Sequence, residues 1–249
     1  MPLKVIIILL LFTTQPGYSV AASRESSELM VVANTNSLLQ YQDDGVNKGP
    51  SIEILNGILT EAQLQADVSF MPWARAFSIA NNRPNTLILS MIRTAERESS
   101  FYWLLKVSHI VRVFISLKSK PENYVDSIEQ AKQKIIAVIL DSAAHKELTI
   151  AGFSEQENLY IVSSDEQMVK LLATGRVDLV YTDPNNVTSY LKKINMPHVE
   201  IRYKEISVQN QRNGYIGLSI NSDKEIVEQL QQAAKRFSKT TEYTSLLLQ

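Results

Sequence analysis

Short apolar runs alternate along the chain with segments in which apolar residues recur every three or four positions. Residues 51–62 show the helical spacing, and Ser51 stands where it could cap that helix. Residues 29–33 form a short apolar run of the strand kind, and Pro72 suits the first turn of another helix. Such alternation predicts an α/β fold with mostly parallel sheets flanked by helices.

The alternation falls into two sets of elements, each with the strand–helix–strand rhythm of a doubly wound sheet. In the first set we expect strands at 29–33, 67–70 and 87–90, with helices beginning at 51 and 72. In the second we expect helices at 126–133, 142–150 and 165–173 and strands at 135–140, 159–162 and 177–181. Asp165 is expected to cap its helix and Gly175 to end it. A strand at 215–220 and a long helix at 223–238 follow.

Between the two sets lies a β-branched run from His109 to Leu117, followed by the polar stretch Lys118–Pro121. We therefore expect two lobes, one made of residues 23–110 and 210–249 and the other of 111–209. The polar segment Gln209–Gly214 is the expected place for the chain to return to the first lobe. Two lobes joined by two crossing strands can close over a ligand in the cleft between them.

The first 22 residues have the pattern of a secretory signal peptide. Lys4 precedes an unbroken apolar run from Val5 to Phe12, and Ser19–Ala22 offers small residues for cleavage after Ala21 or Ala22. The run is much shorter than the roughly 20 residues that cross a bilayer. A membrane anchor or a buried first strand is the alternative reading. The signal peptide predicts a location outside the cytoplasm.

Composition narrows the function classes. The chain has no cysteine, which excludes disulfides, a thiol nucleophile and thiolate metal ligands, and its three histidines are widely separated. We expect neither a metal nor a cofactor. A net charge of −1 gives no indication of a strongly positive surface that would bind nucleic acid or an anionic membrane. We do not expect an enzyme, because phosphate-loop, nucleophile-elbow and zinc-protease motifs are all missing. We also expect the protein to be a monomer.

Three clusters carry candidate binding residues. The segment from Ser90 to Arg97 lies just after the strand residues 87–89, and an Arg there presents a two-pronged donor to a carboxylate. Alternatively, Arg97 forms a surface ion pair with Glu98 or Asp43. Asp183 follows the strand at 177–181, where it either faces the cleft and binds an ammonium or caps the helix that Pro184 opens.

The third cluster is Pro72–Phe77. Trp73 either stacks on a ligand or packs between strand and helix, whereas Phe77 suits the core. Arg75 is either a second anion-binding group or part of a surface ion pair.

Several segments, by their order and spacing, resemble the family 3 periplasmic solute-binding proteins, which serve polar amino acid ABC transporters. The resemblance covers essentially the whole chain after the signal peptide. Its marks are Gln42-Asp43-Asp44-Gly45, Lys48-Gly49-Pro50-Ser51-Ile52-Glu53-Ile54-Leu55, Pro72-Trp73-Ala74-Arg75-Ala76, Thr94-Ala95-Glu96-Arg97 and Leu172-Ala173-Thr174-Gly175-Arg176-Val177-Asp178.

The resemblance implies the two-lobed type II fold and a small polar, amino-acid-like ligand in the cleft. It places the ligand carboxylate at Arg97, and the ligand amino group at Ser90 and Asp183. Ser142 matches a second-lobe donor to the carboxylate, although the family's preceding Gly is Asp141 here.

The stacking aromatic of the family is replaced in this chain by Leu39, which leaves Tyr41 or Trp73 to take its place. The resemblance also implies an inner-membrane ABC permease as partner. A sensory module that reports to a membrane receptor, or a dehydratase-like enzyme on the same scaffold, is the alternative.

Overall fold

The computed structural model describes residues 28–206, 208 and 212–247. The expected signal peptide lies outside the described residues and stays a prediction, as does the return segment around residues 209–211. In the described part of the chain, no helix is long and apolar enough to cross a membrane.

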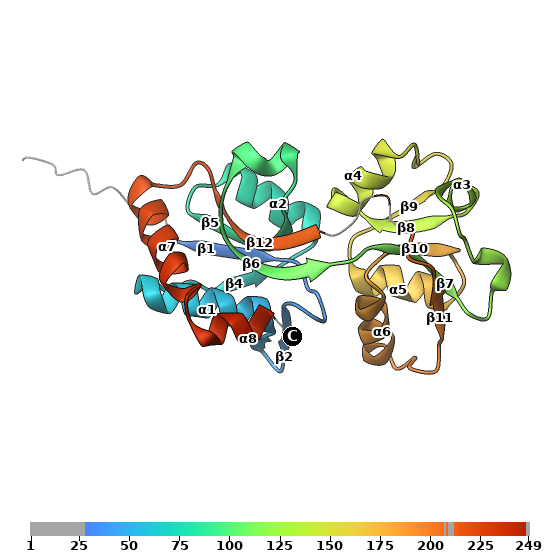
Figure 1. Ribbon diagram of the computed structural model, residues 1–249, viewed down its shortest axis with the longest axis horizontal. Coiled ribbons are helices and arrows are strands. Elements are labelled where there is room, and N and C mark those ends of the chain that lie inside the picture. Colours follow the sequence, from blue (N-terminus) through green and yellow to red (C-terminus); the bar gives the residue numbers. More distant parts are fainter. Residues whose placement is uncertain (1–27, 207, 209–211, 248–249) are drawn as a thin grey trace, which may run out of the picture.

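Two five-stranded sheets lie side by side along the long axis of the molecule (Figure 1). The first sheet has the order β4-β1-β5-β12-β6. Its strands are β1 (Met30–Ala33), β4 (Val68–Phe70), β5 (Thr86–Ile92), β6 (Phe101–Ile110) and β12 (Arg212–Ser219). Strand β1 is parallel to β4 and β5, whereas β12 is antiparallel to β5 and β6.

The second sheet has the order β11-β7-β10-β8-β9. Its strands are β7 (Val113–Leu117), β8 (Ile136–Ile139), β9 (Leu159–Val162), β10 (Leu179–Thr182) and β11 (Ile201–Tyr203). Strand β8 is parallel to β9 and β10, and β7 is antiparallel to β10 and β11. We call the first sheet with its helices lobe 1 and the second sheet with its helices lobe 2.

Each sheet is mixed rather than mostly parallel, because each contains one strand that is antiparallel to both of its neighbours. That strand is β12 in the first sheet and β7 in the second. Strands β6 and β7 belong to different sheets and are separated only by Val111 and Arg112. The single strand expected at 109–117 is therefore two strands, and the chain passes from lobe 1 to lobe 2 between them.

The helices of lobe 1 cover both faces of its sheet (Figure 1). They are α1 (Pro50–Ala62), α2 (Trp73–Asn82), α7 (Lys224–Phe237), α8 (Thr241–Leu247) and the 3-10 helix η1 (Ala95–Ser100). Helices α1 and α7 share the largest core, and they pack closely because Gly57 leaves room for the Phe237 ring. A Cβ atom at Gly57 would lie 2.2 Å from that ring. Helix α2 packs on the other face through Trp73 and Ala76.

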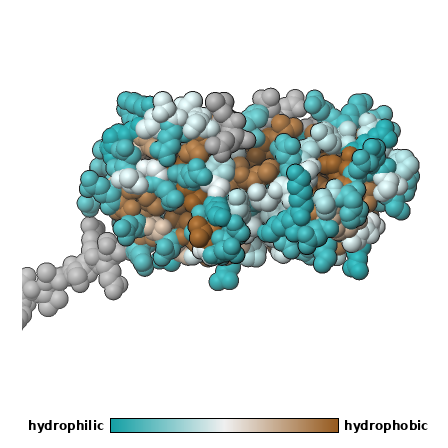
Figure 2. Space-filling model, turned by 90° about the horizontal axis from the view of Figure 1, so that it is seen from below, coloured by the Kyte–Doolittle hydropathy of each residue, from teal (hydrophilic) through white to brown (hydrophobic). Residues whose placement is uncertain are grey.

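Lobe 2 has the same layered plan. Its helices are α3 (Ile128–Ala131), α4 (Ala143–Ile150), α5 (Asp165–Ala173), α6 (Pro184–Lys193) and the 3-10 helix η2 (Pro121–Asn123). Helices α5 and α6 bury Val169 and Val187 against one face of the sheet, and α4 buries Leu148 against the other. Seen from below, hydrophilic side chains cover much of both halves, with hydrophobic ones showing between them (Figure 2).

Two helix caps differ from the sequence prediction. Helix α1 begins at Pro50 after Gly49, so Ser51 lies inside its first turn and is completely buried. Helix α5 is capped by Ser164, whose hydroxyl accepts a hydrogen bond from the Gln167 amide, and Asp165 is its first residue. A cap must have non-helical backbone, and in both helices the preceding residue provides it.

Some elements were not predicted by periodicity. A hairpin of β2 (Tyr41–Asp43) and β3 (Val46–Lys48) turns at Asp44 and Gly45, most of β6 was missed, and so were β11 and α8. The helix expected at 126–133 is limited to the four residues of α3. The other expected helices and strands form within a few residues of their predicted limits.

Candidate binding site between the lobes

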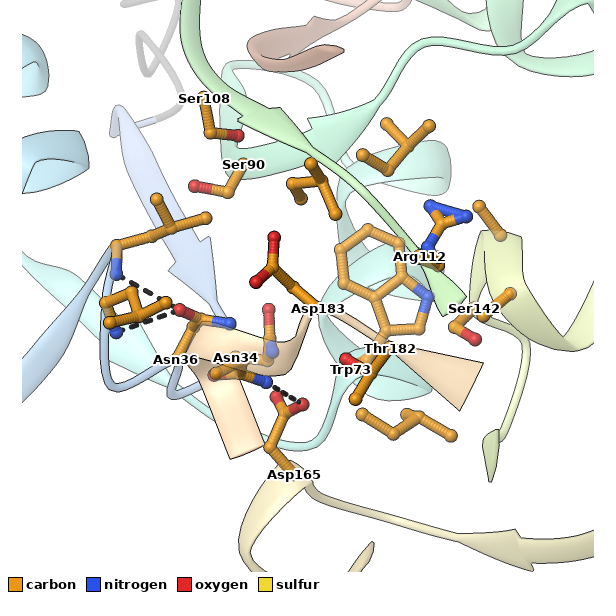
Figure 3. Close-up of a pocket in the computed structure, with 18 of the residues that line it drawn as sticks. Asn34, Asn36, Trp73, Ser90, Ser108, Arg112, Ser142, Asp165, Thr182 and Asp183 are labelled. Carbon is orange, nitrogen blue, oxygen red and sulfur yellow. Dashed lines mark hydrogen bonds between the residues drawn. The ribbon is translucent and has the colours of Figure 1, made fainter. Parts of the chain in front are cut away.

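A pocket of about 170 Å³ lies between the two lobes, at the ends of strands from both sheets (Figure 3). Lobe 1 contributes Asn34 after β1 and Ser90 on β5, and lobe 2 contributes Ser142 after β8 and Asp183 after β10. Open α/β sheets bind ligands at the carboxyl ends of their parallel strands. Because pockets for drug-sized molecules begin at about 300 Å³, this one suits a small solute.

Arg97 lines this pocket from lobe 1 and is only 2% exposed. Its Nη1 donates to the Ile92 carbonyl at 3.1 Å and its Nη2 to the Asp141 carbonyl of lobe 2 at 3.4 Å. Its Nε is buried and has no hydrogen-bond partner within the described residues. Burial lowers the pKa of Arg97 to about 10, so the guanidinium is still charged at neutral pH.

Neither surface ion pair considered for Arg97 forms. Glu98 binds the guanidinium of Arg93, and Asp43 binds the ammonium of Lys48. The guanidinium of Arg97 instead lies 4.8 Å from the centre of the Phe77 ring. Arg97 is therefore a buried cation whose donors, in the described structure, meet backbone carbonyls rather than a carboxylate.

Trp73 lines the pocket and also packs in lobe 1, so the packing role is observed, whereas stacking on a ligand stays a prediction. Its ring is 7% exposed and stacks on Phe77 with centroids 6.0 Å apart. Its Nε1 donates to the Asp141 carbonyl at 3.0 Å. That carbonyl thus accepts from both Trp73 and Arg97 and ties lobe 2 to lobe 1. The backbone of Asp141 is left-handed, with φ 54°, a conformation that favours glycine.

Ser90 lines the pocket on β5, with its hydroxyl engaged inside lobe 1. It donates to Gln40 Oε1 at 2.6 Å and shares a 2.8 Å hydrogen bond with the hydroxyl of the buried Ser51. Its φ of 52° is rare for a residue other than glycine.

Ser142 and Asp183 each line the pocket at the start of a lobe 2 helix. The Ser142 hydroxyl caps α4 by accepting from the His145 amide at 3.1 Å. Asp183 caps α6, since its Oδ1 accepts from the Asn185 amide at 2.8 Å, and its Oδ2 accepts from the Val111 amide at 3.4 Å. In the view of Figure 3, the Asp183 carboxylate lies between Ser90 and the Trp73 indole. The cap and the pocket-facing position, alternatives in the sequence, therefore coexist.

Two predicted residues lie away from this pocket. Arg75 is on the exposed face of α2, because the buried face holds Trp73, Ala76 and Ala80. Tyr41 is in the β2–β3 hairpin and lines an adjoining outer groove, which shares Ser108 and Asp183 with this pocket. Neither residue is placed by the structure to contact a solute in this pocket.

The sequence reading missed Arg112, which lines the pocket at the passage between the lobes. It is 7% exposed, and its Nη1 binds both carboxylate oxygens of Glu147 at 2.8 Å. Its one sequence signal is that it is the only charged residue, His excepted, in the apolar run 109–117. The buried pair fixes α4 to the crossing segment, which is Val111–Arg112 between β6 and β7.

Asp165 also lines the pocket and was predicted only as a cap. It is 5% exposed, and its Oδ1 accepts from Asn186 Nδ2 at 2.7 Å. Burial raises the pKa of Asp165 to about 6, and the Asn186 hydrogen bond partly offsets this effect. The buried Ser108 hydroxyl faces the pocket from lobe 1 and finds no hydrogen-bond partner among the described residues.

Further contacts hold the lobes together beside the pocket. Tyr190 of lobe 2 donates to the Thr35 carbonyl at 3.1 Å, and the Ser37 hydroxyl donates to Asn186 Oδ1 at 3.4 Å. On another side, Lys146 of α4 binds the Glu96 carboxylate. The structure is thus a closed arrangement of the two lobes. Within the described residues, no three His, Asp or Glu side chains gather as metal ligands.

Comparisons with known proteins identify the fold of this chain. No protein family model matches the chain. A histidine kinase sensor domain with similarity to periplasmic binding proteins superposes with a TM-score of 0.75 at 14% identity, covering 90% of this chain and 96% of that one. The arginine-, lysine-, histidine-binding protein ArtJ from Geobacillus stearothermophilus superposes with a TM-score of 0.73 at 17% identity, covering 88% and 93%. The chain has the periplasmic-binding-protein fold.

A curated relative points the same way. The L-cystine-binding protein TcyA of Bacillus subtilis (strain 168) is 24% identical over 166 residues, which are 66% of this chain and 60% of that protein. The resemblance to amino-acid-binding proteins of the family 3 type, expected from the sequence, is therefore confirmed. These relatives are named as binding proteins rather than enzymes.

Proposed function

We propose that this chain is a periplasmic solute-binding protein that captures a small, polar, amino-acid-like solute between its lobes for ABC-type import. The observation that carries the proposal is the pocket itself, because charged side chains of opposite sign, Arg97 from lobe 1 and Asp183 from lobe 2, both line it. Attraction to both ends of a zwitterion needs one cation and one anion across a cleft.

The contacts of Arg97 suggest how the solute is held. Its bond to the Asp141 carbonyl is long, at 3.4 Å, and its Nε has no partner among the described residues. A ligand carboxylate can replace the carbonyl after a small opening of the lobes, and would form a stronger, charge-assisted pair. In this proposal residues 23–110 and 210–249 move as one body and 111–209 as the other, and the signal peptide is removed on export.

Calorimetric titration with a panel of amino acids tests the proposal. A solute that binds is also expected to stabilise the folded protein. When the solute is present at about 100 times its dissociation constant, the free energy of unfolding should rise by about 2.7 kcal/mol. Arg97→Ala should abolish that binding. Arg75→Ala is the matched control, since Arg75 is exposed and does not line the pocket. Unchanged affinity in the Arg97 variant would remove the site assignment, and slow consumption of a bound solute would point to an enzyme.

A sensory role is the second candidate, favoured by the similarity to a histidine kinase sensor domain over 90% of the chain. The two roles differ in the partner that reads the closed form: an ABC permease or a membrane receptor. Uptake of labelled ligand by cells with and without the gene separates them. Import predicts that uptake falls when the gene is deleted, whereas sensing leaves it intact.

A further inference from the structure

The charged groups that line the pocket are equal in number, but one of the cations is already paired with a carboxylate outside the lining. The lining holds two guanidiniums, Arg97 and Arg112, and two carboxylates, Asp165 and Asp183. Glu147 lies against Arg112 and neutralises it. With Glu147 included, there are three carboxylates and two guanidiniums, which leaves one negative charge in excess. A zwitterion with no net charge would not change this excess.

Asp165 is where the excess is concentrated. It forms no ion pair with another described residue, and its hydrogen bond from Asn186 is with a neutral amide. Asp183, in contrast, accepts from two backbone amides at the start of α6 and beside the crossing segment. A carboxylate 95% removed from solvent without a cation nearby is unfavourable, and the raised pKa of Asp165 has this origin.

The surroundings of Asp165 are organised around the pocket. Asn186 is itself buried and accepts a hydrogen bond from the Ser37 hydroxyl of lobe 1, so its Nδ2 is directed toward the Asp165 carboxylate. From the opposite lobe, the buried Ser108 hydroxyl has no described partner and also lines the pocket. Both lobes thus contribute polar oxygen atoms to the lining of the pocket.

Resting on the proposed function, we propose that the pocket takes a ligand with a net positive charge, an amino acid with a basic side chain or a related small amine. Asp165 is then the residue that determines specificity, because its carboxylate receives the second, distal cation. One extra positive charge brings the site to neutrality, and a closed pocket favours neutrality because unpaired charges there have lost their water. The ligand ammonium at Asp183 and its carboxylate at Arg97 keep the positions proposed above.

A purely structural role for Asp165, as a link between α5 and α6, makes a different prediction. Such a link affects the stability of the protein but has no reason to distinguish a charged ligand from a neutral one of the same shape. L-arginine and L-citrulline form such a pair, since they are nearly isosteric and differ in the charge of the distal group.

Calorimetric titration of the full mature chain with L-arginine, L-lysine, L-citrulline and L-glutamine tests the inference. The wild type is expected to bind a basic amino acid at least about tenfold more tightly than its neutral counterpart. Asp165→Asn keeps an acceptor oxygen for Asn186, and should remove most of that preference while leaving citrulline within about threefold. Glu166→Gln is the control, because Glu166 is the next residue, is exposed, and does not line this pocket. It should bind like the wild type.

The outcomes separate the two proposals. Tight binding of neutral amino acids without preference for basic ones overturns the charge assignment and leaves the proposed function intact. No binding of any amino acid or small amine overturns both. If Asp165→Asn fails to fold, the ratio of arginine to citrulline affinity in the wild type still decides the charge of the ligand. An arginine preference that persists in a folded Asp165→Asn protein overturns the role of Asp165.

Discussion

Replacing Asp165 with Asn should stabilise the ligand-free protein at neutral pH, and the gain should vanish in acid. The pKa of this carboxyl rises from 3.8 to about 6 on folding, chiefly because it is buried. The folded protein therefore holds the proton more tightly than the unfolded chain does. This contribution to stability is fully present below pH 3.8 and is lost as the pH rises through about 6. Asn resembles the protonated acid at every pH.

The size of the effect follows from the shift. Each pKa unit corresponds to about 1.4 kcal/mol, so a shift of about two units gives about 3 kcal/mol between fully protonated and fully ionised states. The positive end of α5 favours the ionised carboxylate at its first position by about 0.3–1 kcal/mol, which reduces the figure. Between about pH 4 and about pH 8, the wild type should thus lose about 2 kcal/mol relative to the variant.

Urea unfolding of both proteins, followed by circular dichroism at several pH values, measures this difference. Glu166→Gln should follow the wild type, because its carboxylate is exposed. Parallel stability curves for the wild type and Asp165→Asn would refute the reasoning, since they would show that Asp165 titrates alike in folded and unfolded chains.

Three further substitutions test other parts of the structure by chemical denaturation. Glu147→Ala leaves the buried Arg112 without its anion and should cost about 3–5 kcal/mol, whereas a loss near zero would show the pair to be hydrated. Gly57→Ala should destabilise by about 1–3 kcal/mol, despite the better helix propensity of Ala, because the new methyl group meets the Phe237 ring; a stabilised variant would contradict this packing. Trp73→Phe removes one hydrogen bond between the lobes and should cost about 1 kcal/mol, and an unchanged midpoint would show that the bond does not contribute.

Periodicity predicted most elements because each depends on its own residues. The strand at β1, the helix at α1 and the order of elements in both lobes are properties of short segments, and local pattern is sufficient for them. The cap at Ser51 was predicted wrongly because Gly49 and Pro50 start the helix earlier. The break at Val111 was missed because the apolar run continues on both sides of it, and only Arg112 interrupts it.

The candidate site was predictable from local sequence where a residue directly follows a strand, as Asp183 follows β10, whereas Ser90 and Ser142 came from the family resemblance. The pairing of Arg112 with Glu147 was not, because the partners are 35 residues apart and neither segment identifies the other. Asp165 looks locally like an ordinary helix start. Its burial depends on α6, packed beside α5, and on the hydrogen bond from Asn186 of that helix.

The position of β12 has a consequence for how the molecule is assembled. All strands of the second sheet come from the continuous stretch 113–203, so this half has its strands together before the end of the chain is made. The first sheet differs, because β12, which lies between β5 and β6, comes from residues 212–219. Until that segment arrives, β5 and β6 each keep an unsatisfied edge that can pair with another copy. Synthesis and refolding therefore include an interval in which the N-terminal half is open to aggregation.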